Sequence, residues 1–134
     1  MAAATLYQTA IEAYGTPEEI REAAEHCIEV TERHMALHPD DALALSRGAC
    51  ALVAAGEIAR GLEWAEKAYA INHKICAYNV ACAFVRAGNT DRALDVLAEH
   101  ASWSNMDRSW IEKDVDWQSV RDHPRFRAIL DSLD

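Results

Sequence analysis

Basic charge is scarce in this sequence. Its 13 Lys and Arg residues are outnumbered by 22 Asp and Glu residues, which gives a net charge of −9 at pH 7 and a pI near 5.0. Nucleic acids and anionic membranes both recruit basic surfaces, so the composition argues against either as a partner. A basic or neutral protein partner is compatible with this charge.

Long apolar runs and targeting signals are also lacking. Charge-free stretches such as Gly48–Gly56 fall far short of the ~20 apolar residues that span a bilayer. The N-terminal residues contain no basic region ahead of an apolar segment, so we expect no secretory leader. The four cysteines form no CxxC pair and lie in apolar helical patterns, which indicates reduced core thiols in a cytoplasmic protein. They are Cys27, Cys50, Cys76 and Cys82.

Motifs for catalysis and metal binding are missing as well. There is no phosphate-binding glycine loop, no GxSxG turn and no HExxH pair. His34 and His38 have the one-face spacing of a metal pair, but His38-Pro39 lies at an expected helix end. Cys50 and Cys82 lie in alanine-rich helices, where an inert thiol is the usual outcome. We therefore expect no enzyme activity, no metal and no cofactor.

Helical periodicity dominates what is present. No alternating strand pattern occurs, so the expected fold class is all-α. Thr16-Pro17-Glu18-Glu19 is a strong helix start, in which Thr16 caps and Glu19 reaches back as a capping box. The expected helices cover residues 3–14, 16–37, 41–55, 58–72, 75–87 and 90–100.

A pattern of small residues and leucine occurs twice, 32 residues apart from Gly56 to Gly88. Gly56 and Gly88 would end helices in the left-handed conformation. Small residues at helix crossings allow two antiparallel helices to approach closely while leucines insert between neighbours. The first copy is Ala49, Gly56, Gly61, Leu62 and Ala68, and the second is Ala81, Gly88, Ala93, Leu94 and His100.

This pattern resembles the tetratricopeptide repeat, a helix pair that recurs about every 34 residues. The resemblance implies a right-handed stack of about three antiparallel helix pairs in a single domain, residues 1–134. Residues 3–39 would form a degenerate first repeat, 40–73 the second, 74–100 the third, and 101–134 a C-terminal cap. The second repeat has His73 where the family prefers proline.

The C-terminal region resembles the ending of many bacterial tetratricopeptide proteins. The similar segments are Asp107–Asp114 and Trp117–Phe126. Such endings occur in free-standing proteins and in C-terminal modules of class III adenylate cyclases and signalling kinases. The stretch Glu32–Asn72 is similar to the segment that precedes this ending in the cyclase-linked group. The chain could therefore be an adaptor or a regulatory module whose catalytic part lies elsewhere.

Three tryptophans spaced seven apart, Trp103, Trp110 and Trp117, are expected to seal the last repeat. The alternative is a partner-anchoring aromatic patch, since tryptophan is favoured at binding hot spots. One continuous helix through Asp114–Trp117 is not expected. The other residues of the expected seal are Met106, Ile111, Val115, Phe126, Ile129, Leu130 and Leu133.

The family resemblance also implies a concave groove lined by the first helix of each pair. Such a groove would bind a protein partner as an amphipathic helix or an extended peptide. The alternatives are a groove filled by residues 3–14 or by a second copy of the chain, and an apolar pocket for a small ligand or substrate. The implied groove residues are Leu43, Ser46, Arg47, Cys50, Val53, Ile75, Tyr78, Asn79, Cys82, Val85 and Arg86.

Overall fold

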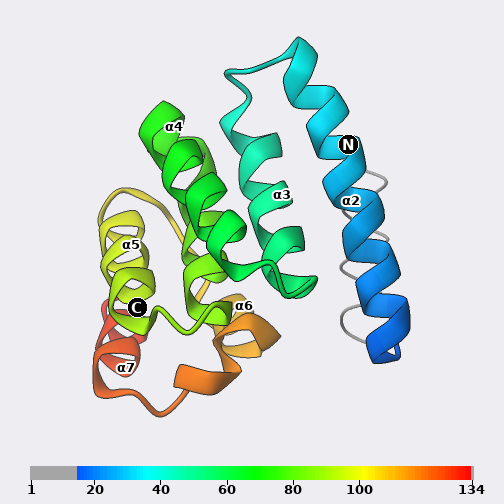
Figure 1. The fold of residues 1–134 in the computed structure, drawn as a ribbon. Helices are drawn as coiled ribbons and strands as arrows, with labels where there is room; N and C mark the ends of the chain where they lie inside the picture. Colours follow the sequence, from blue (N-terminus) through cyan, green and yellow to red (C-terminus); the bar gives the residue numbers. More distant parts are fainter. Residues whose placement is uncertain (1–14, 134) are drawn as a thin grey trace.

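The computed structural model describes residues 15–133, and every regular element in that range is a helix. The expected all-α class is therefore confirmed (Figure 1). The expected helix Ala3–Tyr14 lies outside the described residues. The elements are α2 (Pro17–Leu37), α3 (Ala42–Ala54), α4 (Ile58–Arg86), α5 (Thr90–Trp103), α6 (Arg108–Lys113), the 3-10 helix η1 (Val115–Val120) and α7 (Pro124–Asp131).

Side-chain caps fix where the first helices begin. At α2 the Thr16 hydroxyl accepts a hydrogen bond from the Glu19 backbone N–H at 3.2 Å, and the Glu19 carboxylate accepts one from the Thr16 N–H at 3.0 Å. The expected capping box is thus confirmed. At α3 the Asp41 carboxylate accepts from the Ala44 N–H at 3.0 Å and lies 2.7 Å from His34 Nε2. These hydrogen bonds lower the pKa of Asp41, the bond from Ala44 being the larger cause.

The sequence predicts a two-residue connection, His73-Lys74, between two helices, whereas the structure has only one non-helical residue there. Two helical segments of α4 meet at Asn72, the residue with non-helical backbone angles (φ −158°, ψ 84°). The Cys76 thiol donates to the Asn72 carbonyl at 3.2 Å, within the interrupted turn. Burial raises the pKa of this thiol to about 11. The helix expected to start at Ile75 therefore starts two residues earlier, directly after the break.

Glycines let the chain turn and let helices approach. Gly56 and Gly88 have φ of 88° and 87°, which confirms the expected left-handed helix ends. At Gly61 a Cβ atom would lie 2.7 Å from Val53 Cγ2, so α3 and α4 cross closely there, as the small-residue pattern predicts. Gly48 was not expected at a crossing, yet its Cβ would lie 2.6 Å from the Trp64 ring.

Packing follows the order of the chain. α2 contacts α3, α3 contacts α4 and α4 contacts α5, so α2 and α5 lie on opposite sides of the α3–α4 pair (Figure 1). Residues 104–133, called the tail below, follow α5 in the chain. Within the tail, η1 packs on α4 and α7 packs on α5. One core cluster extends from α3 to α7, and a smaller one lies between α2 and α3. No described helix is long and apolar enough to cross a membrane.

The three tryptophans differ in their surroundings. Trp117 is wholly buried and stacks on Phe126, with ring centroids 5.5 Å apart. Trp110 is 58% exposed and Trp103 36% exposed, so only Trp117 has the burial that the expected seal requires. Val115, another residue of the expected seal, is 61% exposed. The helix ends at Lys113 and η1 follows, which confirms that no continuous helix joins Trp110 to Trp117.

The four cysteines all lie within the described residues, and no disulfide joins them. Cys27, Cys76 and Cys82 are buried, in agreement with the expected core positions. Cys50 is only partly buried, so the expectation of a core thiol holds less well there.

Candidate functional site

The implied groove residues lie on two helical segments that contact each other. The α3 strip consists of Leu43, Ser46, Arg47, Cys50 and Val53 on α3. The α4 strip consists of Ile75, Tyr78, Asn79, Cys82, Val85 and Arg86 on the second half of α4. Asn79 joins the two strips, because its side-chain N–H donates to the Ser46 hydroxyl at 3.3 Å and its backbone carbonyl accepts from the Cys50 thiol at 3.3 Å. The two strips are therefore in direct contact through Asn79.

Burial divides these residues into two groups. Ile75 is 55% exposed, and the partly buried members are Leu43, Arg47, Cys50, Tyr78, Asn79 and Arg86. The remaining four, Ser46, Val53, Cys82 and Val85, are buried and belong to the packing between elements. The surface that a partner could reach is thus narrower than the full set implied by the sequence.

The tail contacts one edge of the α4 strip. The Tyr78 hydroxyl donates to the Asp114 carboxylate at 2.5 Å and accepts from Trp117 Nε1 at 2.9 Å. The Arg86 guanidinium forms an ion pair with Asp116 at 3.5 Å. Burial is the main cause of a raised pKa for Tyr78, with the Asp114 carboxylate contributing, so the phenol stays protonated and keeps donating. These contacts dock the tail through side chains that the sequence assigned to a partner surface.

Three side chains beside this contact have the chemistry of metal ligands. The Cys82 sulfur and carboxylate oxygens of Asp114 and Asp116 lie within 4.8 Å of one another. Burial raises the pKa of the Cys82 thiol well above its usual value, with Asp116 contributing, so the thiol is protonated at neutral pH. Both carboxylates already have partners, Tyr78 for Asp114 and Arg86 for Asp116. The arrangement is therefore a closed hydrogen-bonding network that holds the tail.

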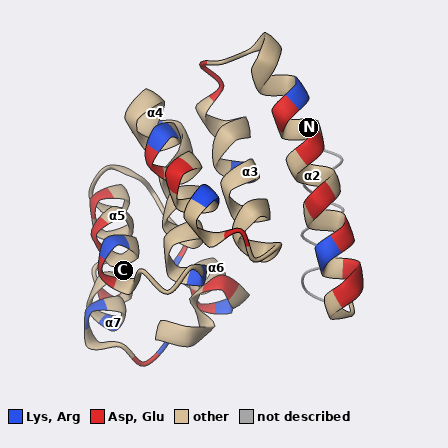
Figure 2. Ribbon diagram, in the orientation of Figure 1, with Lys and Arg blue, Asp and Glu red and all other residues tan. Residues whose placement is uncertain are grey.

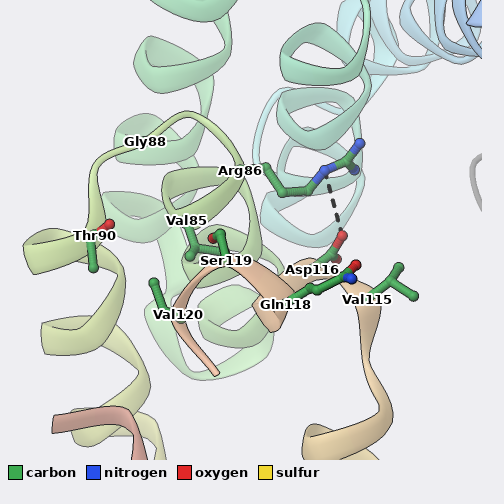
Figure 3. A pocket seen from close by; sticks show the side chains of 9 residues that line it. All are labelled: Val85, Arg86, Gly88, Thr90, Val115, Asp116, Gln118, Ser119 and Val120. Carbon is green, nitrogen blue, oxygen red and sulfur yellow. Dashed lines mark ion pairs between the residues drawn. The ribbon is translucent and has the colours of Figure 1, made fainter. Parts of the chain in front are cut away.

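An open cavity of about 670 Å³ lies where the α4 strip meets the tail (Figure 3). The Arg86–Asp116 ion pair lies along one side of it, so its main charges cancel there. Hydroxyl and amide groups of Thr90, Gln118 and Ser119 supply the other polar groups, and three valines supply apolar area. The cavity is lined by Val85, Arg86, Gly88, Thr90, Val115, Asp116, Gln118, Ser119 and Val120.

Two tail residues that were not among the implied groove residues lie next to side chains of the α4 strip. Trp110 packs on Tyr78, with ring centroids 4.8 Å apart, and Val115 is 61% exposed beside the Arg86–Asp116 pair. The available signal was the pair Asp114 and Asp116 in the tail, because carboxylates need hydrogen-bond donors when they are partly buried. The sequence could not show which helix would supply those donors.

Comparison with known proteins adds no relative. No family model matches the chain, and neither a curated protein nor a solved structure is significantly similar to it.

Proposed function

We propose that this chain is a non-catalytic interaction module that binds a peptide or a helix of another protein along the α3 and α4 strips. In this proposal the helices form a short right-handed stack of antiparallel pairs similar to tetratricopeptide repeats. Packing of each of helices α2 to α5 on its neighbour in sequence supports that arrangement. The left-handed glycines at Gly56 and Gly88, at equal places in the duplicated pattern, support it further.

The proposal rests on Ile75, an exposed apolar side chain of the second half of α4. Tyr78 and Arg86 of the same segment already contact the tail. Ile75 is 55% exposed on the α4 strip, one helical turn before Asn79. Leu43, at the corresponding place in the duplicated pattern, is partly buried on the α3 strip, which contacts the α4 strip through Asn79. Trp110, which packs on Tyr78, adds a large exposed aromatic side chain next to the α4 strip. Apolar anchors of this kind, bordered by polar groups, are what a docking helix or extended segment uses.

A peptide selection tests the proposal, because it requires no identified partner. The purified protein is used to select binders from a phage-displayed library of random peptides about 12 residues long. Selected peptides are then synthesised, and their affinities are measured for the unmodified protein and for Ile75→Glu. We expect Ile75→Glu to weaken binding at least about tenfold, or about 1.4 kcal/mol, because it places a charge in the apolar contact.

Ile58→Glu is the matched control, since it makes the same chemical change at another exposed isoleucine of α4. Peptide affinity should survive this substitution, and circular dichroism should show both variants folded. Selected peptides that bind Ile75→Glu as tightly as the unmodified protein would place the binding surface elsewhere and refute the proposal.

A further inference from the structure

The charge of the two strips is opposite to that of the whole chain. The net charge is −9, yet α3 and residues 73–86 contain no Asp or Glu. Their charged residues other than histidine are all cationic: Arg47, Lys74 and Arg86. By contrast, acidic residues occur along the length of α2 (Figure 2). Carboxylates are therefore excluded from both helical segments that carry the strips.

The tail shows what this surface binds within the molecule. Asp114 accepts the Tyr78 hydroxyl proton in a hydrogen bond, and Asp116 pairs with Arg86. The residue between them, Val115, stays 61% exposed. A short segment with two carboxylates thus lies against the α4 strip, and the strip supplies a hydroxyl donor and a cation. Side-chain donors on this surface are matched to acidic groups.

The α3 strip also contains a cation, Arg47, but no described acidic side chain pairs with it. Within residues 15–133 the Arg47 guanidinium has no ion pair and no side-chain hydrogen bond. The Arg47 residue is partly buried. Arg47 directly follows Ser46, which accepts the Asn79 hydrogen bond, and Leu43 lies one helical turn before it. A partner lying across both strips would meet this cation beside an apolar surface.

We propose that the partner of this surface is an acidic segment, which places a carboxylate on Arg47 and an apolar side chain against Leu43 and Ile75. This inference rests on the proposed function and specifies the chemistry of its partner. The net charge of −9 is no obstacle, because charges more than about 8 Å apart are largely screened at physiological ionic strength. Arg47 would act at contact distance, where a carboxylate can take two guanidinium hydrogen bonds at once. A basic segment would instead leave this cation facing a like charge.

The same phage-displayed library provides the probe. Peptides that depend on Ile75 are sequenced, and their Asp and Glu content is compared with that of the unselected library. We expect enrichment of carboxylates together with apolar residues. Binding of the synthesised peptides should fall about tenfold or more in Arg47→Ala, because one charge-assisted contact is lost. In Arg47→Glu, binding should be restored when the critical acidic residue of the peptide is replaced by Lys.

Arg33→Ala is the control for net charge. It removes the same charge from an exposed site on α2, where Arg33 pairs with Glu29, and it should leave affinity unchanged. Ile75-dependent peptides that are basic or neutral, or that bind Arg47→Ala normally, would overturn the acidic-partner inference while the interaction surface stands. Failure to select any Ile75-dependent peptide would count against both. A dimer in analytical ultracentrifugation that Ile75→Glu dissociates would assign the surface to a second copy of the chain instead.

Discussion

The α3 strip and the α4 strip have equivalent places in the duplicated pattern but different neighbours. Ser46 on α3 corresponds to Tyr78 on α4, and Arg47 corresponds to Asn79. The Ser46 hydroxyl donates to the Leu43 carbonyl and accepts from the Asn79 side chain, so both of its hydrogen bonds lie within α3 or between α3 and α4. The Tyr78 phenol reaches outward to Asp114 and Trp117 of the tail. The same position of the pattern thus bonds within α3 and to α4 in the first copy, and to the tail in the second copy.

The two strips differ in which of their side chains already have partners within the molecule. The tail attaches where the partly buried Tyr78 phenol provides a donor and Arg86 provides a cation. On the α3 strip the cation is Arg47, and no described carboxylate pairs with it. We therefore expect substitutions at the contacts between the α4 strip and the tail to change the free energy of unfolding. Substitutions at Arg47 on the α3 strip should instead change the binding of a partner.

The largest expected effect comes from removing the anchor of the tail. Trp117→Ala should lower the free energy of unfolding by about 3–5 kcal/mol, because a wholly buried ring that stacks on Phe126 is lost. Trp110→Ala removes the same type of side chain from a 58% exposed position and should cost about 1 kcal/mol or less. Urea unfolding of both variants measures the difference. Equal losses would show that the tail is held by both rings, contrary to their unequal burial.

A second test concerns the helix crossing, where the two copies differ by one methyl group. Gly61 of the first copy corresponds to Ala93 of the second. Gly61→Val should cost roughly 1–3 kcal/mol, because even a Cβ atom would lie 2.7 Å from Val53 Cγ2 and 3.1 Å from the Ala49 carbonyl oxygen. Ala59→Val, at an exposed site of the same helix, should cost only the propensity difference, at most about 0.7 kcal/mol. Indistinguishable melting curves would refute the close crossing.

Helix boundaries were predictable because their causes are local. The capping box at Thr16, the Asp41 cap and the left-handed glycines each involve residues within four positions of one another. The break at Asn72 was placed only approximately, since neither glycine nor proline marks it. The close approach at Gly48 depends on Trp64, a neighbour on another helix, and periodicity alone does not identify such a pair.

The candidate site was harder to predict because its decisive contacts are long-range. Tyr78 and its partner Asp114 are 36 residues apart, and no pattern in the sequence pairs them. The family resemblance implied which helix faces could form a surface, but it could not show that the tail would contact one of them. The net charge of −9 describes the whole chain and not the two strips, whose helical segments contain no Asp or Glu.

The hydroxyl of Tyr78 should have a measurable role in holding the tail. Tyr78→Phe leaves the Trp117 N–H and the Asp114 carboxylate without their shared partner, which should cost about 1–3 kcal/mol. Tyr69→Phe is the control, because that hydroxyl bonds to the exposed Glu99 and its loss should cost less than about 1 kcal/mol. Chemical denaturation compares the two. A cost for Tyr69→Phe that matches or exceeds the cost for Tyr78→Phe would argue against a special role for this docking contact.

The smallest effect expected is a pH dependence specific to the second copy, where His100 stands in place of Ala68. Burial lowers the pKa of His100, and its Nδ1 atom is buried with no hydrogen-bond partner among the described residues. The unfolded chain, with a histidine pKa near 6.5, therefore takes up this proton more readily than the folded chain. The stability that the neutral His100 contributes is fully present above the unfolded-state pKa of about 6.5, and it is lost as pH falls from there through the lowered folded-state pKa. Uptake of one proton changes the free energy of unfolding by less than about 1.4 kcal/mol per pH unit. His100→Ala should flatten the decline in unfolding free energy between pH 7 and pH 5, whereas His26→Ala, at an exposed site, should keep the slope of the unmodified protein. An unchanged slope in His100→Ala would assign the acid sensitivity to other groups and remove this difference between the copies.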